Sequence, residues 1–210
     1  MGLLQDNQIL AAEAVAYVKQ QRLYGTEKAP RGIVAFNNAD TDRWDPLLRI
    51  RSDDDFERMR QRLSEAADMM LERKGEERHG KRVAKLIAGE ALKEGFGNCT
   101  EQAAIAFRFL KKKGALPLDI MTAEYRARLR NGRIVDDTHH FVLVGRPDGT
   151  ESRNMGSWGA QAVVCDPWAP REPLQVYVAP KLGEKMREVL GEFVLAGSIA
   201  RINGAGQSEW

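Results

Sequence analysis

The pattern of apolar residues changes once along this chain, and that change most constrains the fold. Before Gly114 the apolar residues recur mainly at helical spacing, over 8–22, 52–73, 81–94 and 99–113. After Gly114 they form short runs between turn signals, at 118–128, 133–145, 162–166 and 174–178. Helices followed by an antiparallel meander predict an α+β protein.

Asn131-Gly132 is the strongest hairpin signal in the sequence, and it predicts that the strand over 118–128 pairs with the next one. A short strand at 32–36 and a last helix over 181–195 are also expected. We therefore expect a helical extension over 1–80, packed on a core over 81–200, and a flexible glycine-rich tail over 201–210.

The composition excludes several classes of protein. The 210 residues are 43% hydrophobic and 30% charged, which is typical of a globular domain. With 32 basic and 30 acidic residues the net charge is +2, so neither a polyanion nor a nucleic acid is the expected partner. No membrane span and no secretory signal are recognisable. We expect a protein of the cytoplasm, or one delivered into a host cell without a classical signal peptide.

The stretch Gly95-Phe96-Gly97-Asn98-Cys99-Thr100-Glu101 places a cysteine at the start of a helix. Asn98 is a good N-cap, and Glu101 three residues later completes a capping-box pattern. Unpaired backbone N–H groups and the helix dipole then favour a thiolate at Cys99 over a thiol. The alternative is an inert buried thiol, because free cysteines are often core residues.

Two further segments carry groups that could activate Cys99. His139 and His140 open the apolar run Phe141-Val142-Leu143-Val144 and point to opposite faces of the strand, both of which are apolar. The periodicity does not choose between the two histidines. Asp166 ends another apolar strand and is costly to bury unless an imidazole or another group pairs with it. If Asp166 faces the site, Cys165 faces away from it and is better interpreted as a small core residue, so a disulfide between Cys99 and Cys165 is not expected.

Together these residues supply a nucleophile, a base and a group that orients the base. A metal site built from Cys99, His139, His140 and Asp166 is the weaker interpretation, because adjacent histidines on opposite strand faces make poor joint ligands. We expect neither a metal nor a cofactor.

Three motifs resemble the core motifs of the transglutaminase-like thiol enzymes, a branch of the papain-like fold: Gly-Asn-Cys-Thr-Glu-Gln-Ala, His-Phe-Val-Leu-Val and Val-Cys-Asp-Pro-Trp. The resemblance covers about residues 95–180 and implies a sheet packed on the nucleophile helix. It also implies a catalytic triad of Cys99, His140 and Asp166, with His140 preferred because the family's histidine directly precedes the apolar strand.

The family's oxyanion glutamine has no counterpart here, since Lys93 occupies that position. The Cys99 backbone N–H and, as a weak candidate, Asn98 would serve instead, and Trp168 would shield the site. Trp158 is a loose match to the tryptophan that often precedes the family's aspartate.

The family includes bacterial effector proteases and glutamine deamidases. The resemblance therefore implies a thiol hydrolase or acyltransferase acting on protein or peptide amides, as a protease, deamidase or transglutaminase. The alternative is a non-catalytic protein-binding module on the same fold.

Overall fold

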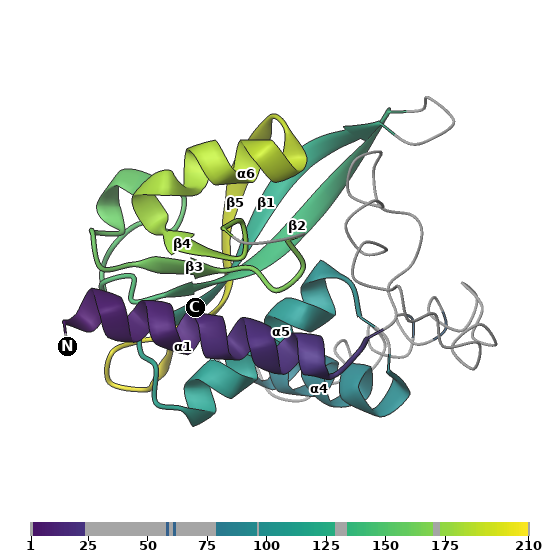
Figure 1. Ribbon diagram of the computed structural model, residues 1–210, viewed down its shortest axis with the longest axis horizontal. Helices are drawn as coiled ribbons and strands as arrows, with labels where there is room; N and C mark the ends of the chain where they lie inside the picture. Colours follow the sequence, from purple (N-terminus) through teal and green to yellow (C-terminus); the bar gives the residue numbers. More distant parts are fainter. Residues whose placement is uncertain are drawn as a thin grey trace.

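The computed structural model describes residues 2–23, 58, 61, 79–95, 97–128, 134–169 and 173–209. In this part, four α-helices surround one sheet (Figure 1), so the predicted α+β class is confirmed. The helices are α1 Leu3–Gln20, α4 His79–Glu94, α5 Cys99–Lys112 and α6 Leu182–Leu190, with 3₁₀ turns η3 Met155–Ser157 and η4 Ala179–Lys181. The predicted strand at 32–36, and the predicted helix over 52–73 apart from residues 58 and 61, lie outside the described residues.

The sheet has the strand order β4-β3-β2-β1-β5-β6, and all neighbouring strands are antiparallel. The strands are β1 Leu118–Arg128, β2 Ile134–Val144, β3 Val163–Cys165, β4 Val176–Val178, β5 Phe193–Ile202 and β6 Ser208–Glu209. Strands β1 and β2 pair without a register shift from Leu118–Val144 to Arg128–Ile134, which confirms the predicted pairing. The turn between them, at 129–133, lies outside the described residues.

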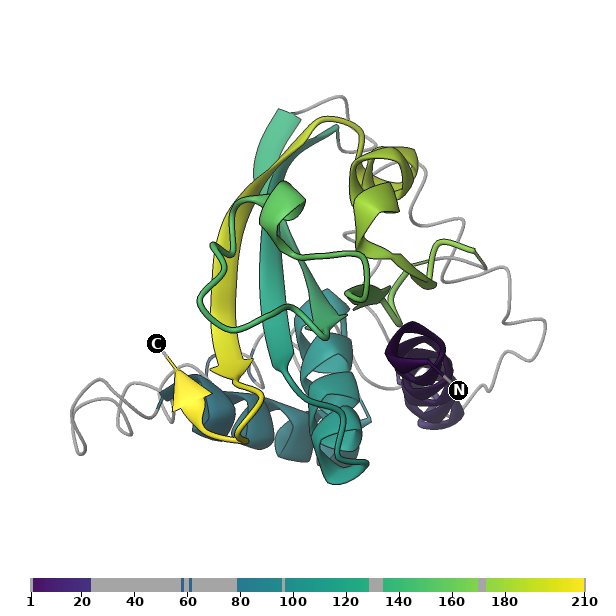
Figure 2. The same cartoon turned by 90° about the vertical axis from the view of Figure 1, so that its left-hand side faces the viewer.

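The sheet is covered on both faces, as Figure 2 shows: α1, α4 and α5 lie on one side and α6 on the other. We call these the helix-bundle face and the α6 face. The core under the helix-bundle face includes Val142, Val144 and Cys165, whereas Phe141 and Leu143 belong to the core under α6. This alternation follows from the two-residue period of a strand. It decides which polar side chains of β2 and β3 can meet.

Helix α5 forms as the sequence predicts. Its buried side includes Ala103, Ala106, Phe107 and Leu110, the four residues expected to share a face. Lysines occupy its last turn, and Gly114 follows with φ +81°. A left-handed residue after a cationic last turn satisfies the free carbonyl groups of a helix end.

The C-terminal part differs from the prediction. The helix expected over 181–195 ends at Leu190, because Gly191 has φ +77° and leaves the helical conformation. Residues 193–202 then form β5, a strand that the apolar pattern did not predict. The expected flexible tail over 201–210 includes the end of β5, a turn at 203–207 and β6. Two register shifts against β1 and the run Ala196-Gly197-Ser198 interrupt the strand period of β5, so its pattern was not recognisable.

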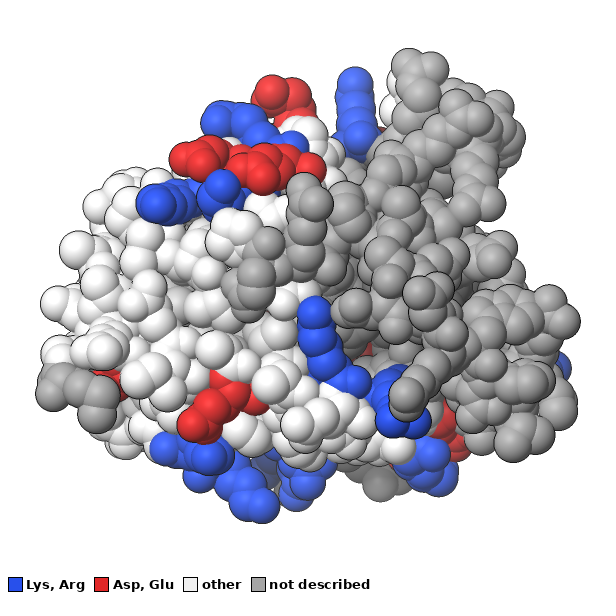
Figure 3. All heavy atoms as spheres, viewed as in Figure 1, with Lys and Arg blue, Asp and Glu red and all other residues white. Residues whose placement is uncertain are grey.

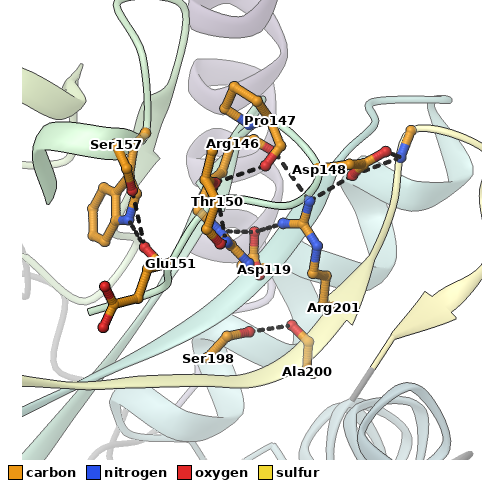
Figure 4. Close-up of polar contacts among 12 residues, drawn as sticks. Asp119, Arg146, Pro147, Asp148, Thr150, Glu151, Ser157, Ser198, Ala200 and Arg201 are labelled. Atoms are coloured by element: carbon orange, nitrogen blue, oxygen red, sulfur yellow. Dashed lines mark hydrogen bonds and ion pairs between the residues drawn. The ribbon is translucent and has the colours of Figure 1, made fainter. Parts of the chain in front are cut away.

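A buried ion network closes the end of the sheet where β1 starts and β2 ends (Figure 4). Both oxygens of Asp119 are bound: Arg146 Nη2 lies 2.7 Å from Oδ1 and Arg201 Nη1 lies 2.6 Å from Oδ2. Arg201 also reaches Asp148 at 2.6 Å, and Arg146 donates to Thr150. The network joins β1, the loop after β2 and β5, and its charges are paired as burial demands.

The face shown in Figure 3 carries charges of both signs over α6, and a largely uncharged surface lies between α6 and α1. None of the helices in the described part of the chain is long and apolar enough to cross a membrane.

Candidate active site

Cys99 is the first residue of α5 and is half-buried. The Glu101 carboxylate accepts a hydrogen bond from the backbone N–H of Asn98 at 2.8 Å, as a capping box requires. Gly97 precedes this turn, and a Cβ there would lie 2.9 Å from Glu101 Cβ and 2.9 Å from Leu23 Cδ1. Gly97, two residues before the cysteine, is therefore needed for close packing at the start of α5.

The sulfur of Cys99 lies at strand β2, where its Sγ is 3.7 Å from the carbonyl oxygen of Thr138. The thiol also packs against the core of the α6 face. Helix α5 lies on the helix-bundle face of the sheet, whereas the thiol at its N-terminus packs against the core of the α6 face. The thiol is therefore close enough to interact with both histidines of β2, which point to opposite faces.

His139 and Asp166 form a buried pair on the α6 face. The distance from His139 Nε2 to Asp166 Oδ2 is 2.7 Å, and each side chain is only 1% exposed. The other carboxylate oxygen, Oδ1, accepts the backbone N–H of Ala169 at 3.1 Å. The carboxylate is thus held from both sides and fixes the orientation of the imidazole.

The register of β3 explains why Asp166 meets His139. Cys165 pairs with Val142, and both side chains lie in the core of the helix-bundle face. Asp166, the next residue, therefore points to the α6 face, which is also the face of His139. The prediction that Cys165 faces away from Asp166 is confirmed. Cys165 is fully buried, and both cysteines are free thiols.

The choice of His140 as the partner of Asp166 is corrected by this geometry. His140 lies on the helix-bundle face, where its Nδ1 is 3.1 Å from Thr100 Oγ1 of helix α5. Both faces of β2 are apolar, so its own sequence could not decide between the histidines. The deciding information is the register of β3 on β2, which is a long-range property.

Trp168 covers the imidazole of His139, with ring centroids 5.0 Å apart and ring planes inclined by 43°. Its indole Nε1 is buried and has no hydrogen-bond partner in the described part of the structure. Trp158 is different, because it is fully buried in the α6-face core and donates to the Glu151 carbonyl at 3.1 Å. Trp168 is thus the tryptophan that excludes water from the Asp166–His139 pair.

Of the other expected site residues, Asn98 lies next to Cys99, whereas Lys93 lies on the surface of α4. Asn98 is half-buried beside Cys99, at the N-cap of α5. Lys93, at the position of the family's oxyanion glutamine, forms ion pairs with Glu90 and Glu94 on α4, and its side chain is 66% exposed. The backbone N–H groups at the start of α5 remain as donors for a developing negative charge.

The electrostatics of the cluster favour a thiolate. Burial by itself raises the pKa of Cys99, but the neighbouring imidazoles of His139 and His140 outweigh it and lower the pKa to about 6. Burial likewise disfavours a charged His139, but Asp166, and then Cys99, raise its pKa to about 10. The lowered thiol pKa and the raised imidazole pKa both favour a Cys99 thiolate beside a His139 imidazolium.

The two nitrogens of His139 have different roles. Nε2 is bound to Asp166, whereas Nδ1 is buried and has no hydrogen-bond partner in the described part of the structure. Nδ1 is therefore the nitrogen left to exchange a proton with the Cys99 sulfur. The thiol of Cys165 behaves differently: burial, followed by the charge of Asp166, raises its pKa.

The pH dependence of alkylation tests this assignment. We expect the rate of reaction of Cys99 with iodoacetamide to be half-maximal near pH 6, because the thiol pKa is about 6 and the protonated thiol does not react. Peptide mass spectrometry after timed quenching measures the rate, with Cys165 as the unreactive internal control. A midpoint near that of an ordinary cysteine would contradict the ion pair.

In the described ranges, no three His, Cys, Asp or Glu side chains gather in an arrangement that could hold a metal ion. Comparison of the chain with models of known families, with curated proteins and with solved structures found no match.

Proposed function

We propose that this protein is a cysteine-dependent acyl-transfer enzyme with a papain-like, transglutaminase-like core, and that it acts on protein or peptide amides. Cys99 is the nucleophile, His139 the acid and base, and Asp166 the group that orients His139. The observation that carries the proposal is the series formed by Asp166, His139 and the Cys99 thiol at a helix N-terminus. Nucleophile, base and orienting carboxylate in this order form the general device for activating a weak nucleophile.

In the first half-reaction the Cys99 thiolate attacks the amide carbonyl carbon and forms a tetrahedral oxyanion. The backbone N–H groups at the start of α5 face this charge, with Asn98 as an additional donor. The C–N bond then breaks, the His139 imidazolium gives its proton to the departing nitrogen, and a thioester remains on Cys99.

In the second half-reaction water attacks the thioester carbon while His139 takes a proton from it. The C–S bond breaks, which releases a carboxylic acid and restores the thiolate. A peptide bond as the substrate gives proteolysis, and a glutamine side chain gives deamidation with loss of ammonia. An amine in place of water gives transglutamination. These outcomes share the same groups on the enzyme, and the motif resemblance to effector enzymes supports a protein target.

Mass spectrometry of proteomes incubated with the wild-type protein or with Cys99→Ala tests the function. We expect new termini, or glutamine converted to glutamate, only with the wild type, because the alanine variant lacks the nucleophile. His139→Ala should behave like Cys99→Ala, whereas Cys165→Ala should retain activity. No Cys99-dependent change, together with slow alkylation of Cys99, would instead indicate a binding module with an unused triad.

A further inference from the structure

The second histidine of β2, His140, takes no part in the Asp166–His139 pair, although it lies close to the same sulfur. Its side chain is half-buried on the helix-bundle face, and its imidazole is near enough to Cys99 to lower the pKa of the thiol. The sulfur therefore has one imidazole on each face of the strand. The partner of His139 is a carboxylate and the partner of His140 is a hydroxyl, so the two histidines are not equivalent.

Thr100 holds the imidazole of His140. This threonine is the second residue of α5, and its Oγ1 lies 3.1 Å from His140 Nδ1. The described part of the structure contains no other hydrogen bond of this imidazole. A hydroxyl can donate to Nδ1, and the proton of a neutral imidazole is then on Nε2. In this tautomer His140 presents an N–H donor, whereas His139 presents a group that exchanges protons.

A buried hydroxyl without a partner lies beside this imidazole. Thr122 is directly opposite His140 in the pairing of β1 with β2, and it therefore points to the same face. It is 7% exposed, and its Oγ1 has no hydrogen-bond partner in the part of the chain that the structure describes. Leaving a buried hydroxyl unpaired costs free energy. The surroundings of His140 are thus suited to a polar atom that a ligand brings.

The position of His139 decides which way a bound amide must face. The amide nitrogen must lie toward His139, because this imidazolium protonates the departing group. The groups on a tetrahedral carbon point to different corners, so the oxyanion faces away from His139. On that side lie the N-terminus of α5, with its backbone N–H groups, and the imidazole of His140. Both can stabilise a developing negative charge.

We propose that His140 is a catalytic residue that donates a hydrogen bond from Nε2 to the oxyanion, and that Thr100 is the residue that positions it. This inference rests on the proposed function. It assigns a side chain to the role that Lys93 leaves open, since Lys93 occupies the position of the family's oxyanion glutamine and lies on the surface of α4. The adjacent histidines then have separate roles: His139 transfers the proton, and His140 binds the oxygen.

Two reagents that both need the thiolate, of which only one forms an oxyanion, test this role without a known substrate. The thiolate attacks 4-nitrophenyl acetate at the carbonyl carbon and forms an oxyanion. The C–O bond then breaks, 4-nitrophenolate departs without needing a proton, and an acetyl thioester remains on Cys99. Iodoacetamide is attacked at its methylene carbon and loses iodide, so no oxyanion forms. The ratio of the acylation rate to the alkylation rate therefore reports on the oxyanion hole and cancels changes in the amount of thiolate.

Both rates are measured at pH 7 by mass spectrometry of the Cys99 peptide. We expect His140→Ala to lower the ratio by about 10²-fold, because one donor to the oxyanion is lost. His140→Gln keeps an N–H near the position of Nε2 and should retain most of the ratio, whereas the shorter His140→Asn should behave like His140→Ala. Thr100→Val removes the hydroxyl that holds Nδ1 and should lower the ratio less than His140→Ala. In the matched control His139→Ala both rates should fall, with the ratio within about threefold of the wild type.

The possible failures are distinguishable. Wild-type rates with both reagents no faster than those of free cysteine contradict the activated thiolate and hence the proposed function. Fast alkylation with an unchanged ratio in His140→Ala, including a fall of both rates by the same factor, contradicts only the oxyanion role of His140. If His140→Ala does not fold, as judged by circular dichroism, equal ratios in His140→Gln and His140→Asn contradict that role.

Discussion

Replacing His139 with alanine is expected to raise the pKa of the Cys99 thiol from about 6 toward its ordinary value, because burial remains while the larger of the two opposing imidazole contributions is lost. The midpoint of the alkylation profile should move by the same amount. At pH 6 the alkylation rate should fall roughly tenfold or more, since the gain in intrinsic nucleophilicity at higher pKa offsets only part of the lost thiolate. Turnover should fall further, by about 10²–10⁴-fold, because the proton donor is also lost.

The matched control is His140→Ala, which changes the neighbouring histidine on the opposite face of β2. His140 also lowers the thiol pKa, but less than His139, so its loss should move the midpoint by a smaller amount. Asp166→Asn keeps the shape of the carboxylate and removes its charge, and it should give an intermediate shift. A larger shift in His140→Ala than in His139→Ala would show that the Asp166–His139 pair is not the activating group.

Local patterns predicted much of this fold and two of the three proposed catalytic residues. The capping pattern around Asn98 and Glu101 located the start of α5, and Asn131-Gly132 predicted the pairing of β1 with β2. Both are encoded within a few residues, so they can be read directly from the sequence. Cys99 and Asp166 followed from their positions at a helix start and a strand end.

The choice of histidine and the existence of β5 could not be predicted in this way, because both depend on pairing between distant strands. His139 and His140 begin the same apolar run, and only the Val142–Cys165 register assigns Asp166 to one of them. The resemblance to known enzymes favoured His140, because it could not supply the register of β3 on β2. Strand β5 follows a helix that ends at Gly191, and its apolar period is broken where it shifts register against β1. Register is fixed by the whole sheet, not by one strand.

Asp119→Ala is expected to destabilise the protein by about 3–5 kcal/mol, because it removes the buried carboxylate that pairs with both Arg146 and Arg201. Urea unfolding followed by circular dichroism measures the change in the free energy of unfolding. The control Glu13→Gln breaks an ion pair with Lys113 whose side chains are 45% and 48% exposed, and it should cost no more than about 1 kcal/mol. If Asp119→Ala does not fold, Asp119→Asn retains the acceptor atom and should show a smaller loss.

The variant Asp119→Asn also tests whether this network positions the active site. The Asp119 network ties the start of β1 to the loop after β2 and to β5, and so it opposes sliding of these strands. A slip of one residue in β2 would turn His139 away from Asp166 and expose the opposite face. We therefore expect Asp119→Asn to raise the midpoint of Cys99 alkylation even where the protein remains folded. Equal stability of Asp119→Ala and Glu13→Gln would contradict the stabilising role of the network. An unchanged midpoint of Cys99 alkylation in Asp119→Asn would show that the network does not fix the register of β2 at His139.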